Sequence, residues 1–287
     1  MHVWKKRVKP EQVEDWTERL SAALDPERVV VVEPPGAQFH RLEVYLDSEP
    51  ETRALVKQFG GGSTEVRAES WQPAPVTAPG KPLSVGGKLL VTSREEELAA
   101  LRAAHADRAV LCIPAAMAFG TGEHATTSMC LRLLLEVSRR REPNGWDVLD
   151  LGMGSGLLAL AGVVFGARHA LGVDNDPHAV RTARENAVRN GISPRQARFE
   201  QAELPVWKNR PPGKTWPVVT ANLFSELLIR LMPEVIAPAV SPGGDLILSG
   251  VLGTQAEEVV ASVQAAGLTL LTTKQRGRWR AFHCGRR

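Results

Sequence analysis

The sequence predicts an α/β protein in which a doubly wound, mainly parallel sheet follows a smaller α+β domain. Two observations favour the large sheet. Strand-like and helix-like segments alternate from residue 147 onward, and a glycine-rich loop joins the first of these strands to its helix. Such alternation is typical of parallel sheets with helices on both faces. A third observation, the order strand–helix–strand–strand–helix–strand in the first 69 residues, predicts the small domain.

The small domain is expected over residues 1–69. Apolar residues recur at helical spacing in its first helix and alternate in its third strand. Ser48 and Glu51 form a candidate capping box for the second helix, which Gly60 would end. The expected elements are a strand at 2–8, a helix at 11–23, strands at 29–32 and 39–46, a helix at 52–59 and a strand at 64–68. This order matches the split βαβ, ferredoxin-like layout.

Proline and glycine are frequent in residues 70–88, which predicts a linker between the domains. The second domain is then expected over residues 89–287. Ser93 and Glu96 form a second candidate capping box. The first elements expected after the linker are a strand at 88–92, a helix at 93–106 and a strand at 109–113.

The large sheet is expected to follow. Asp176 is the candidate cap of its second helix, which Asn190 and Gly191 would end. The expected strands are 147–151, 169–173, 197–199, 217–220, 244–249, 268–274 and 280–284, and the expected helices are 156–165, 177–189, 226–236 and 254–266. The last two strands lie too close together for a parallel crossover, which needs a dozen or more residues. One late strand should therefore be antiparallel.

Composition excludes several classes of protein. The 287 residues suit about two domains, and 43% hydrophobic with 23% charged residues is ordinary for a soluble globular chain. The longest aliphatic run is 29–32, far short of the roughly 20 residues that span a membrane, and no secretory signal is visible. The three cysteines form no disulfide framework or metal knuckle. We expect a cytoplasmic monomer without a metal. The net charge of +3 indicates ordinary surface charge rather than a nucleic-acid or membrane partner.

The glycine loop is the strongest functional signal. After the strand 147–151 come three alternating glycines, Gly152, Gly154 and Gly156. Glycines let a nucleotide-like ligand approach the backbone, and in doubly wound sheets the ligand lies at the carboxyl ends of the strands. Asp174 ends the next strand, where a carboxylate can accept hydrogen bonds from both ribose hydroxyls. A tight turn without a ligand is the alternative.

Two cofactor classes share this layout. The dinucleotide fingerprint G-x-G-x-x-G/A fails from Gly152, where the sixth residue is Leu157, and matches weakly from Gly154. Enzymes that use S-adenosylmethionine instead favour an acidic residue, one spacer and G-x-G-x-G, which Asp150 completes. A carboxylate suits the positive methionine ammonium and would repel a pyrophosphate. The loop therefore favours S-adenosylmethionine.

The motifs on either side of the loop carry a family resemblance. Residues 116–127 read AMAFGTGEHATT and residues 220–227 read TANLFSEL. With the glycine loop, they resemble the PrmA family, the methyltransferases of large-subunit ribosomal protein eleven. The match extends from about residue 116 to residue 287. The small domain resembles that family's substrate-recognition domain only in layout and size.

The resemblance implies the class I S-adenosylmethionine-dependent methyltransferase fold, a doubly wound seven-stranded sheet with one antiparallel strand. It also implies methylation of protein amino groups, on lysine side chains and the α-amino group. Thr127 matches a threonine near the cofactor, Gly152 and Asp174 match the cofactor loop and the ribose carboxylate, and Asn222 matches an asparagine beside the methyl group.

The candidate residues keep their alternatives. Asn222 could accept an amine hydrogen without adding a charge, or it could cap the helix that follows. Phe119 and Phe224 are candidate walls of an amine channel or core residues, and Trp279 has the same two interpretations. His124 is a candidate base or a scaffold residue. Glu203 is placed to reach the adenine edge, and Gly120 and Gly122 suggest a lid.

The sequence departs from the family ahead of its first motif. Pro114, Ala115 and Ala116 replace an acidic residue, proline and glycine, and Trp71 stands without a second tryptophan. Methyl transfer is therefore better supported than the ribosomal substrate, and another protein substrate is a second hypothesis. A nucleic-acid methyltransferase would carry proline after Asn222, which this chain lacks. A dinucleotide-dependent oxidoreductase and a cofactor-binding module without catalysis are the remaining alternatives.

Overall fold

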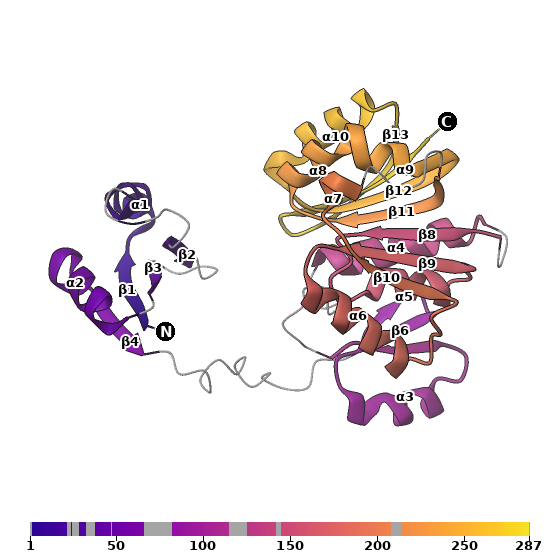
Figure 1. Cartoon of the computed structure of the whole chain (residues 1–287), viewed down its shortest axis with the longest axis horizontal. Coiled ribbons are helices and arrows are strands. Elements are labelled where there is room, and N and C mark those ends of the chain that lie inside the picture. Colours follow the sequence, from indigo (N-terminus) through magenta and orange to yellow (C-terminus); the bar gives the residue numbers. More distant parts are fainter. Residues whose placement is uncertain are drawn as a thin grey trace. The chain divides into compact units, whose positions relative to one another are not determined.

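The chain forms two compact units, Met1–Gly80 and Lys81–Arg287. The computed structural model describes residues 2–21, 24, 29–32, 38–46, 48–65, 82–114, 125–141, 145–207 and 214–286 (Figure 1). The small unit has one sheet and one hydrophobic core, whereas the large unit has two sheets and two clusters of buried apolar residues. None of the helices in the described ranges is long and apolar enough to cross a membrane.

The small unit has the predicted order of strands and helices. Its elements are β1 (His2–Val8), α1 (Val13–Ser21), β2 (Val29–Val32), β3 (His40–Leu46), α2 (Glu49–Phe59) and β4 (Gly62–Glu65), with a short 3-10 turn at Pro10–Gln12. The strands form an antiparallel sheet in the order β2-β3-β1-β4. Side chains from both helices pack on one face around Trp4, Leu42 and Val44. The assignment of this unit to the ferredoxin-like class stays a prediction.

The ends of α2 differ from the predicted capping. Ser48 occupies the N-cap position but its side chain makes no capping hydrogen bond, so the predicted capping box is not formed. The helix begins at Glu49, and Gly60 ends it with a positive φ of 67°. Trp4 and Lys6 of β1 donate hydrogen bonds to the carbonyls of Gly60 and Phe59, both at 2.7 Å. These bonds satisfy carbonyls that the helix itself leaves without a partner.

A three-stranded sheet opens the large unit. It consists of β5 (Leu83–Val85), β6 (Leu89–Thr92) and β7 (Ala109–Cys112), with β5 antiparallel and β7 parallel to β6. Residues 83–85 were predicted as linker, and that part of the prediction is wrong. Glu95–Glu97 form a 3-10 turn before α3 (Leu98–Ala104). Ser93 caps neither of them, because Arg94 is the N-cap of the 3-10 turn and Glu97 is the N-cap of α3, and neither side chain makes a capping hydrogen bond.

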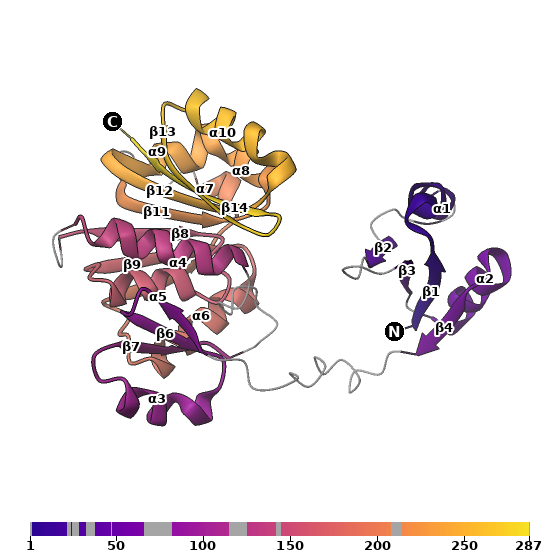
Figure 2. The same cartoon turned by 180° about the vertical axis from the view of Figure 1, so that it is seen from behind.

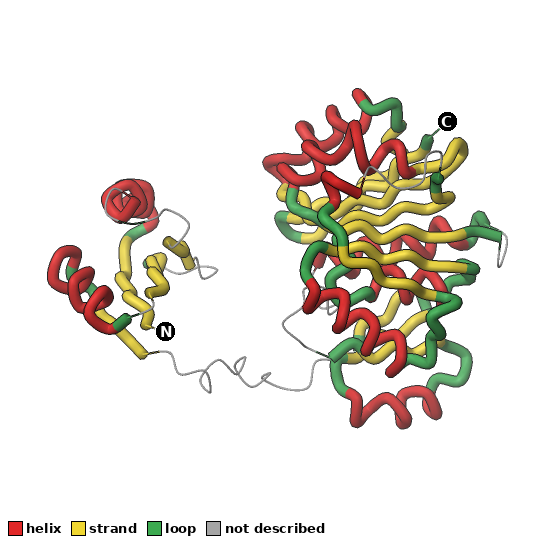
Figure 3. Tube along the Cα trace, in the orientation of Figure 1, coloured by secondary structure: helices red, strands yellow, loops and turns green. Residues whose placement is uncertain are grey.

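The seven strands of the large sheet follow the order β10-β9-β8-β11-β12-β14-β13. Figure 3 shows its strands stacked side by side in yellow. They are β8 (Asp147–Leu151), β9 (His169–Asp174), β10 (Ala197–Gln201), β11 (Trp216–Asn222), β12 (Val240–Leu252), β13 (Thr269–Arg276) and β14 (Trp279–Gly285). β14 pairs antiparallel with both β12 and β13, and all other pairs in this sheet are parallel, so the predicted antiparallel strand is confirmed.

Helices cover both faces of this sheet (Figures 1 and 2). One face packs against α4 (Ala125–Ser138), α5 (Leu157–Val164) and α6 (Pro177–Arg189). The other face packs against α7 (Leu204–Trp207), α8 (Ser225–Leu231), a π-helical turn (Met232–Ile236), α9 (Ala237–Ala239) and α10 (Ala256–Ala265), which a 3-10 turn at Gly253–Gln255 precedes. The predicted cap of α6 is confirmed, because Asp176 Oδ1 accepts a hydrogen bond from His178 N at 2.8 Å.

Helix α4 was not predicted. It contacts the seven-stranded sheet through β12 and β14 and the three-stranded sheet through β5, so it lies between two sheets of the large unit. Eleven of its 14 residues are buried. A helix that is buried on nearly all sides has no polar face, and its sequence therefore lacks the period that identifies a surface helix.

Candidate functional site

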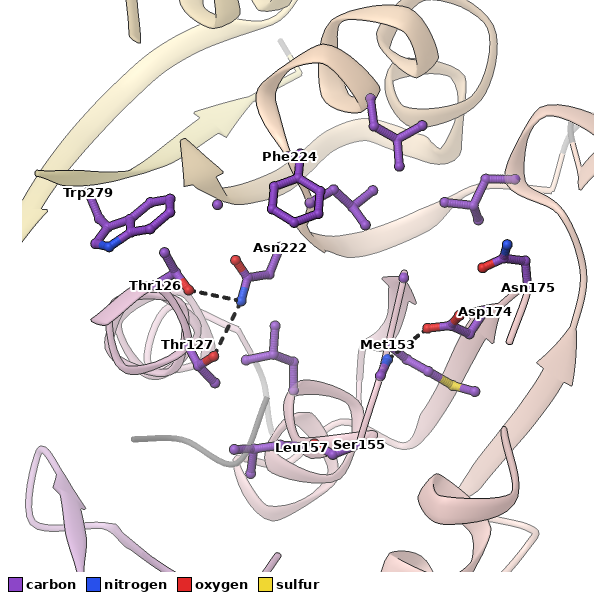
Figure 4. A pocket seen from close by; sticks show the side chains of 17 residues that line it. Thr126, Thr127, Met153, Ser155, Leu157, Asp174, Asn175, Asn222, Phe224 and Trp279 are labelled. Carbon is purple, nitrogen blue, oxygen red and sulfur yellow. Dashed lines mark hydrogen bonds between the residues drawn. The ribbon is translucent and has the colours of Figure 1, made fainter. Parts of the chain in front are cut away.

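A cavity of about 300 Å³ opens at the carboxyl ends of the central strands. The strand order reverses between β8 and β11, which is where doubly wound sheets bind their ligands. Seventeen residues line the cavity (Figure 4): Thr126, Thr127, Gly152, Met153, Gly154, Ser155, Leu157, Leu158, Asp174, Asn175, Leu204, Asn222, Leu223, Phe224, Leu227, Gly250 and Trp279.

The three loop glycines all have positive φ, at 69°, 52° and 79° for Gly152, Gly154 and Gly156. They serve different purposes. Gly152 and Gly154 line the cavity, whereas Gly156 does not. A Cβ on Gly156 would lie 2.9 Å from the Ala183 Cβ and 3.2 Å from the Phe199 ring. Gly156 therefore allows α5 to pack against α6 and β10, a role that the spacing of the glycines does not reveal.

Asp174 is held in place by backbone donors at the end of β9. Its Oδ2 accepts a hydrogen bond from Gly154 N at 2.9 Å, and its Oδ1 accepts one from Asp176 N at 3.1 Å. Each carboxylate oxygen can accept about two hydrogen bonds, so each retains capacity for a further donor. The half-buried carboxylate lines the cavity. It can therefore bind two neighbouring hydroxyl groups, as a ribose presents.

Asn222 ends β11 on the opposite side of the cavity from Asp174 (Figure 4). Its Nδ2 lies 3.4 Å from Thr126 Oγ1 and 3.3 Å from Thr127 Oγ1, in the first turn of α4. Its Oδ1 is buried and accepts no hydrogen bond from any residue that the structure describes. The N-cap of α8 is Phe224, so the alternative interpretation of Asn222 as the helix cap is wrong. Asn222 thus brings to the cavity wall a neutral acceptor for which the described residues supply no donor.

Two aromatic side chains flank Asn222 (Figure 4). Phe224 is 74% exposed although it lines the cavity, so it is not a core residue. Trp279, at the start of β14, lines the cavity and also packs against the hydrophobic core. Together they give one side of the cavity an apolar surface that could hold an aliphatic chain.

Asp150 does not line the cavity. It points to the face of the sheet that α4 and α5 cover, where it is 1% exposed and accepts a hydrogen bond from Thr220 Oγ1 at 2.7 Å. Burial raises the pKa of Asp150 to about 7, although the bond from Thr220 acts in the opposite direction. The described cavity offers no direct contact between this carboxyl and a bound ligand.

Other predicted residues lie elsewhere. Glu203 is exposed and does not line the cavity, although its neighbour Leu204 does. Phe119, His124, Gly120 and Gly122 lie outside the described residues, as do Ala115 and Ala116. Within the described ranges, no three His, Cys, Asp or Glu side chains are grouped as a metal site requires.

Sequence reasoning missed part of the cavity wall. The cavity is also lined by three leucines that the sequence analysis did not identify, Leu204, Leu223 and Leu227. Leu223 and Leu227 belong to the TANLFSEL segment, whose leucines recur one turn apart and could have been identified from that spacing. Leu204 follows β10 in a short helix and carries no comparable signal.

Comparisons with known proteins agree with these features. The family model described as Ribosomal protein L11 methyltransferase (PrmA) matches residues 39–287. A protein of that name from Xylella fastidiosa is 42% identical over 173 residues, which are 60% of this chain and 54% of the relative. Another, from Pelobacter propionicus, is 37% identical over 223 residues, 76% of this chain and 67% of the relative. The chain spans about half the length of the first relatives that it matches.

A solved structure shows the fold. The ribosomal protein L11 methylase of Lactobacillus delbrueckii subsp. bulgaricus superimposes with a TM-score of 0.61 at 22% identity. The match covers 73% of this chain and 99% of that one. The large unit therefore has the class I methyltransferase fold that the sequence predicted. With a family match across residues 39–287, the chain belongs to the PrmA family.

Proposed function

We propose that the protein is an S-adenosylmethionine-dependent N-methyltransferase that acts on amino groups of large-subunit ribosomal protein L11, on lysine side chains, the α-amino group or both. One observation carries the proposal. A single cavity at the sheet's switch point is lined by the carboxylate of Asp174 and by Asn222, whose buried amide oxygen accepts no hydrogen bond from the part of the chain that the structure describes. The first suits a ribose and the second suits an amine.

The cavity fits S-adenosylmethionine by the chemistry of its donors and acceptors. Asp174 would bind the ribose hydroxyls, and the backbone of Gly152 and Gly154 would lie against the ligand. Thr127 would lie near the bound cofactor. Its hydroxyl would also hold the Asn222 amide in position by accepting a hydrogen bond from it. The bound cofactor supplies a methyl group on a positively charged sulfur. Asp150, being enclosed behind the cavity, would act on the ligand only at a distance.

Asn222 would orient the attacking amine. Methyl transfer to nitrogen is an in-line displacement, for which alignment can contribute roughly 7–11 kcal/mol. The nitrogen must be neutral, whereas a free lysine has a pKa of about 10.4. Entry of the amine into a partly desolvated cavity lowers that pKa. A neutral amide oxygen can accept a hydrogen bond from the amine N–H without stabilising the charged ammonium form. A carboxylate in its place would stabilise that form. Phe224 and Trp279 would enclose the aliphatic part of the lysine.

The remaining assignments are also proposals. Phe119 would form a further wall of the amine channel, His124 would act as a base or a scaffold, and Glu203 would reach the adenine edge. The small domain that the sequence predicts, residues 1–69, would recognise the substrate. The segment from residue 70 to the start of β5 would act as a linker, and the catalytic domain would then extend to residue 287. We further propose a cytoplasmic monomer that does not bind nucleic acid directly.

Labelled S-adenosylmethionine tests the activity. The protein is incubated with purified ribosomal protein L11, with a total protein extract or with RNA, and the labelled product is identified. We expect label on L11. Label on another protein alone would mean that this other protein, and not L11, is the substrate. Label on RNA alone would overturn the proposal. Stabilisation by NADH, but not by S-adenosylmethionine or S-adenosylhomocysteine, would indicate an oxidoreductase. Binding of S-adenosylmethionine without any transfer would indicate a cofactor-binding module.

A further inference from the structure

Asn186 connects helix α6 to the glycine loop from behind the cavity. It is 1% exposed. Its Nδ2 donates a hydrogen bond to Ser155 O at 2.9 Å, and its Oδ1 accepts one from Arg189 Nη1 at 2.8 Å. Ser155 lines the cavity between two of the loop glycines, whereas Asn186 itself does not. A buried amide on one helix thus bonds to the backbone carbonyl of a residue that lines the cavity.

The loop needs such restraint because glycine loses more conformational freedom on ordering than any other residue. Two side chains bond to consecutive residues of the loop. Asp174 accepts from Gly154 N, and Asn186 donates to Ser155 O. One bond therefore comes from the residue that would hold the ribose, and the other comes from a residue outside the cavity. Together they fix the orientation of the peptide groups around Gly154 and Ser155.

Asn190 provides an internal comparison. It lies one turn further along α6, at the C-cap, and its amide forms two hydrogen bonds with Cys112 at the end of β7, both at 2.8 Å. Its Nδ2 also donates to Asn186 O at 2.8 Å. Asn186 and Asn190 are thus the same residue type on one face of one helix. Asn186 bonds to the glycine loop, whereas Asn190 bonds to the three-stranded sheet of the large unit.

Arg189 extends the network away from the cavity. Its Nε donates to Glu95 Oε2 at 3.0 Å, in the 3-10 turn before α3. The Oδ1 of Asn186 therefore accepts from a side chain that is itself fixed, which leaves Nδ2 to face Ser155. The orientation of the Asn186 amide follows from its two partners, because Arg189 can only donate and a carbonyl can only accept.

We propose that Asn186 is a positioning residue for the cofactor: it fixes the Ser155 peptide, and so the shape of the glycine loop, without touching the ligand. The proposal rests on the proposed function, because the ligand that the loop receives is S-adenosylmethionine. Loss of the donor leaves Ser155 O without that bond and the glycine loop less ordered before binding. The ligand must then order the loop itself, which weakens its affinity.

The test uses the full chain and S-adenosylhomocysteine as the probe. Asn186→Asp keeps an acceptor for Arg189 but removes the donor to Ser155 O. Asn186→Ser adds no charge, and its shorter side chain no longer reaches Ser155 O. Asn190→Ala is the matched control. Titration calorimetry gives the Kd, thermal unfolding gives the Tm, and methyl transfer gives KM and kcat. We expect Kd and the KM for S-adenosylmethionine to rise about tenfold in both Asn186 variants, as the loss of one hydrogen bond predicts. We expect kcat to change less.

The control separates positioning from general stability. Asn190→Ala should lower the Tm but keep the Kd within twofold of the wild-type value. A wild-type Kd in a folded Asn186→Ser or Asn186→Asp variant would overturn the proposal, and so would an equal loss of affinity in Asn190→Ala. These outcomes leave the proposed function intact as long as the wild-type protein binds S-adenosylhomocysteine and transfers methyl groups. A wild-type protein that does neither would overturn both.

Discussion

Replacement of Asp174 by alanine tests the assignment of the cofactor site most directly. The carboxylate would accept hydrogen bonds from two ribose hydroxyls, and in the structure it also accepts from Gly154 N and Asp176 N. Asp174→Ala removes all of these acceptors at once. The substitution should therefore weaken ligand binding and, to a smaller degree, destabilise the free protein.

The size of the effect follows from the number and kind of bonds. A hydrogen bond to a charged partner contributes about 1.5–3 kcal/mol. Asp174 is half-buried, so the lower value applies to each of two ribose bonds. The loss is then about 3 kcal/mol, which corresponds to a roughly 150-fold increase in Kd. Loosening of the Gly154 peptide would add to this value.

Titration calorimetry with S-adenosylhomocysteine measures the change, and Asp176→Ala is the matched control. Asp176 is an aspartate two residues further on that caps α6 through His178 N and does not line the cavity. Its replacement should cost about 1 kcal/mol of stability, as loss of an N-cap does, and leave the Kd unchanged. An Asp174→Ala variant whose Kd stays within threefold of the wild-type value would refute the ribose assignment. Equal losses in the two variants would attribute the effect to stability alone.

Three further predictions concern the amine side and the buried acid. Asn222→Ala should lower kcat by about 10²-fold or more while the Kd for S-adenosylhomocysteine rises less than threefold, because loss of alignment affects the transition state most; equal losses in single-turnover rate and binding would mean that Asn222 is structural. Phe224→Ala should raise the KM for the protein substrate about tenfold at constant Tm, because this side chain is 74% exposed; an unchanged KM in steady-state assays would exclude it from the channel. Burial raises the pKa of Asp150 from 3.8 to about 7, so between these values the folded state keeps a proton that the unfolded state has lost, and stability falls as the pH rises from about 4 to 7. Asp150→Asn should remove this contribution, at most about 4 kcal/mol, and urea unfolding at several pH values that shows the same slope in both proteins would contradict the assignment.

The sequence was most informative for elements whose apolar residues recur with a clear period, such as helices that have one face in the core and the other in solvent. Strands and amphipathic helices of the large sheet follow from period and turn residues, and the spacing of the last two strands correctly predicted an antiparallel member. Helix α4 was missed because burial between two sheets removes its polar face. The two capping boxes failed for different reasons: Ser48 is at the N-cap but its side chain makes no capping hydrogen bond, whereas the turn after Ser93 begins one residue later, with Arg94 at its N-cap.

The site shows the same limit at the level of single residues. Asp174 and Asn222 both line the cavity, because the carboxyl ends of parallel strands lie at one edge of the sheet. Asp150 occupies the expected motif position, yet its side chain points into the core beneath α4 and α5. Gly156 has the spacing of a ligand-binding glycine and serves helix packing instead. Spacing along the chain identifies the loop but does not distinguish which of its residues face the ligand.

The position of β14 has a consequence for the order in which the large unit is completed during synthesis. β14 lies between β12 and β13, although β13 precedes it in sequence. During synthesis, strands β8 to β12 can pair as they emerge, whereas β13 has no neighbour in the sheet until residues 279–285 follow. Trp279, which lines the cavity, arrives with that same strand. A nascent chain would therefore gain its complete ligand cavity only in the step that inserts the final strand, which would delay cofactor capture until the sheet is whole.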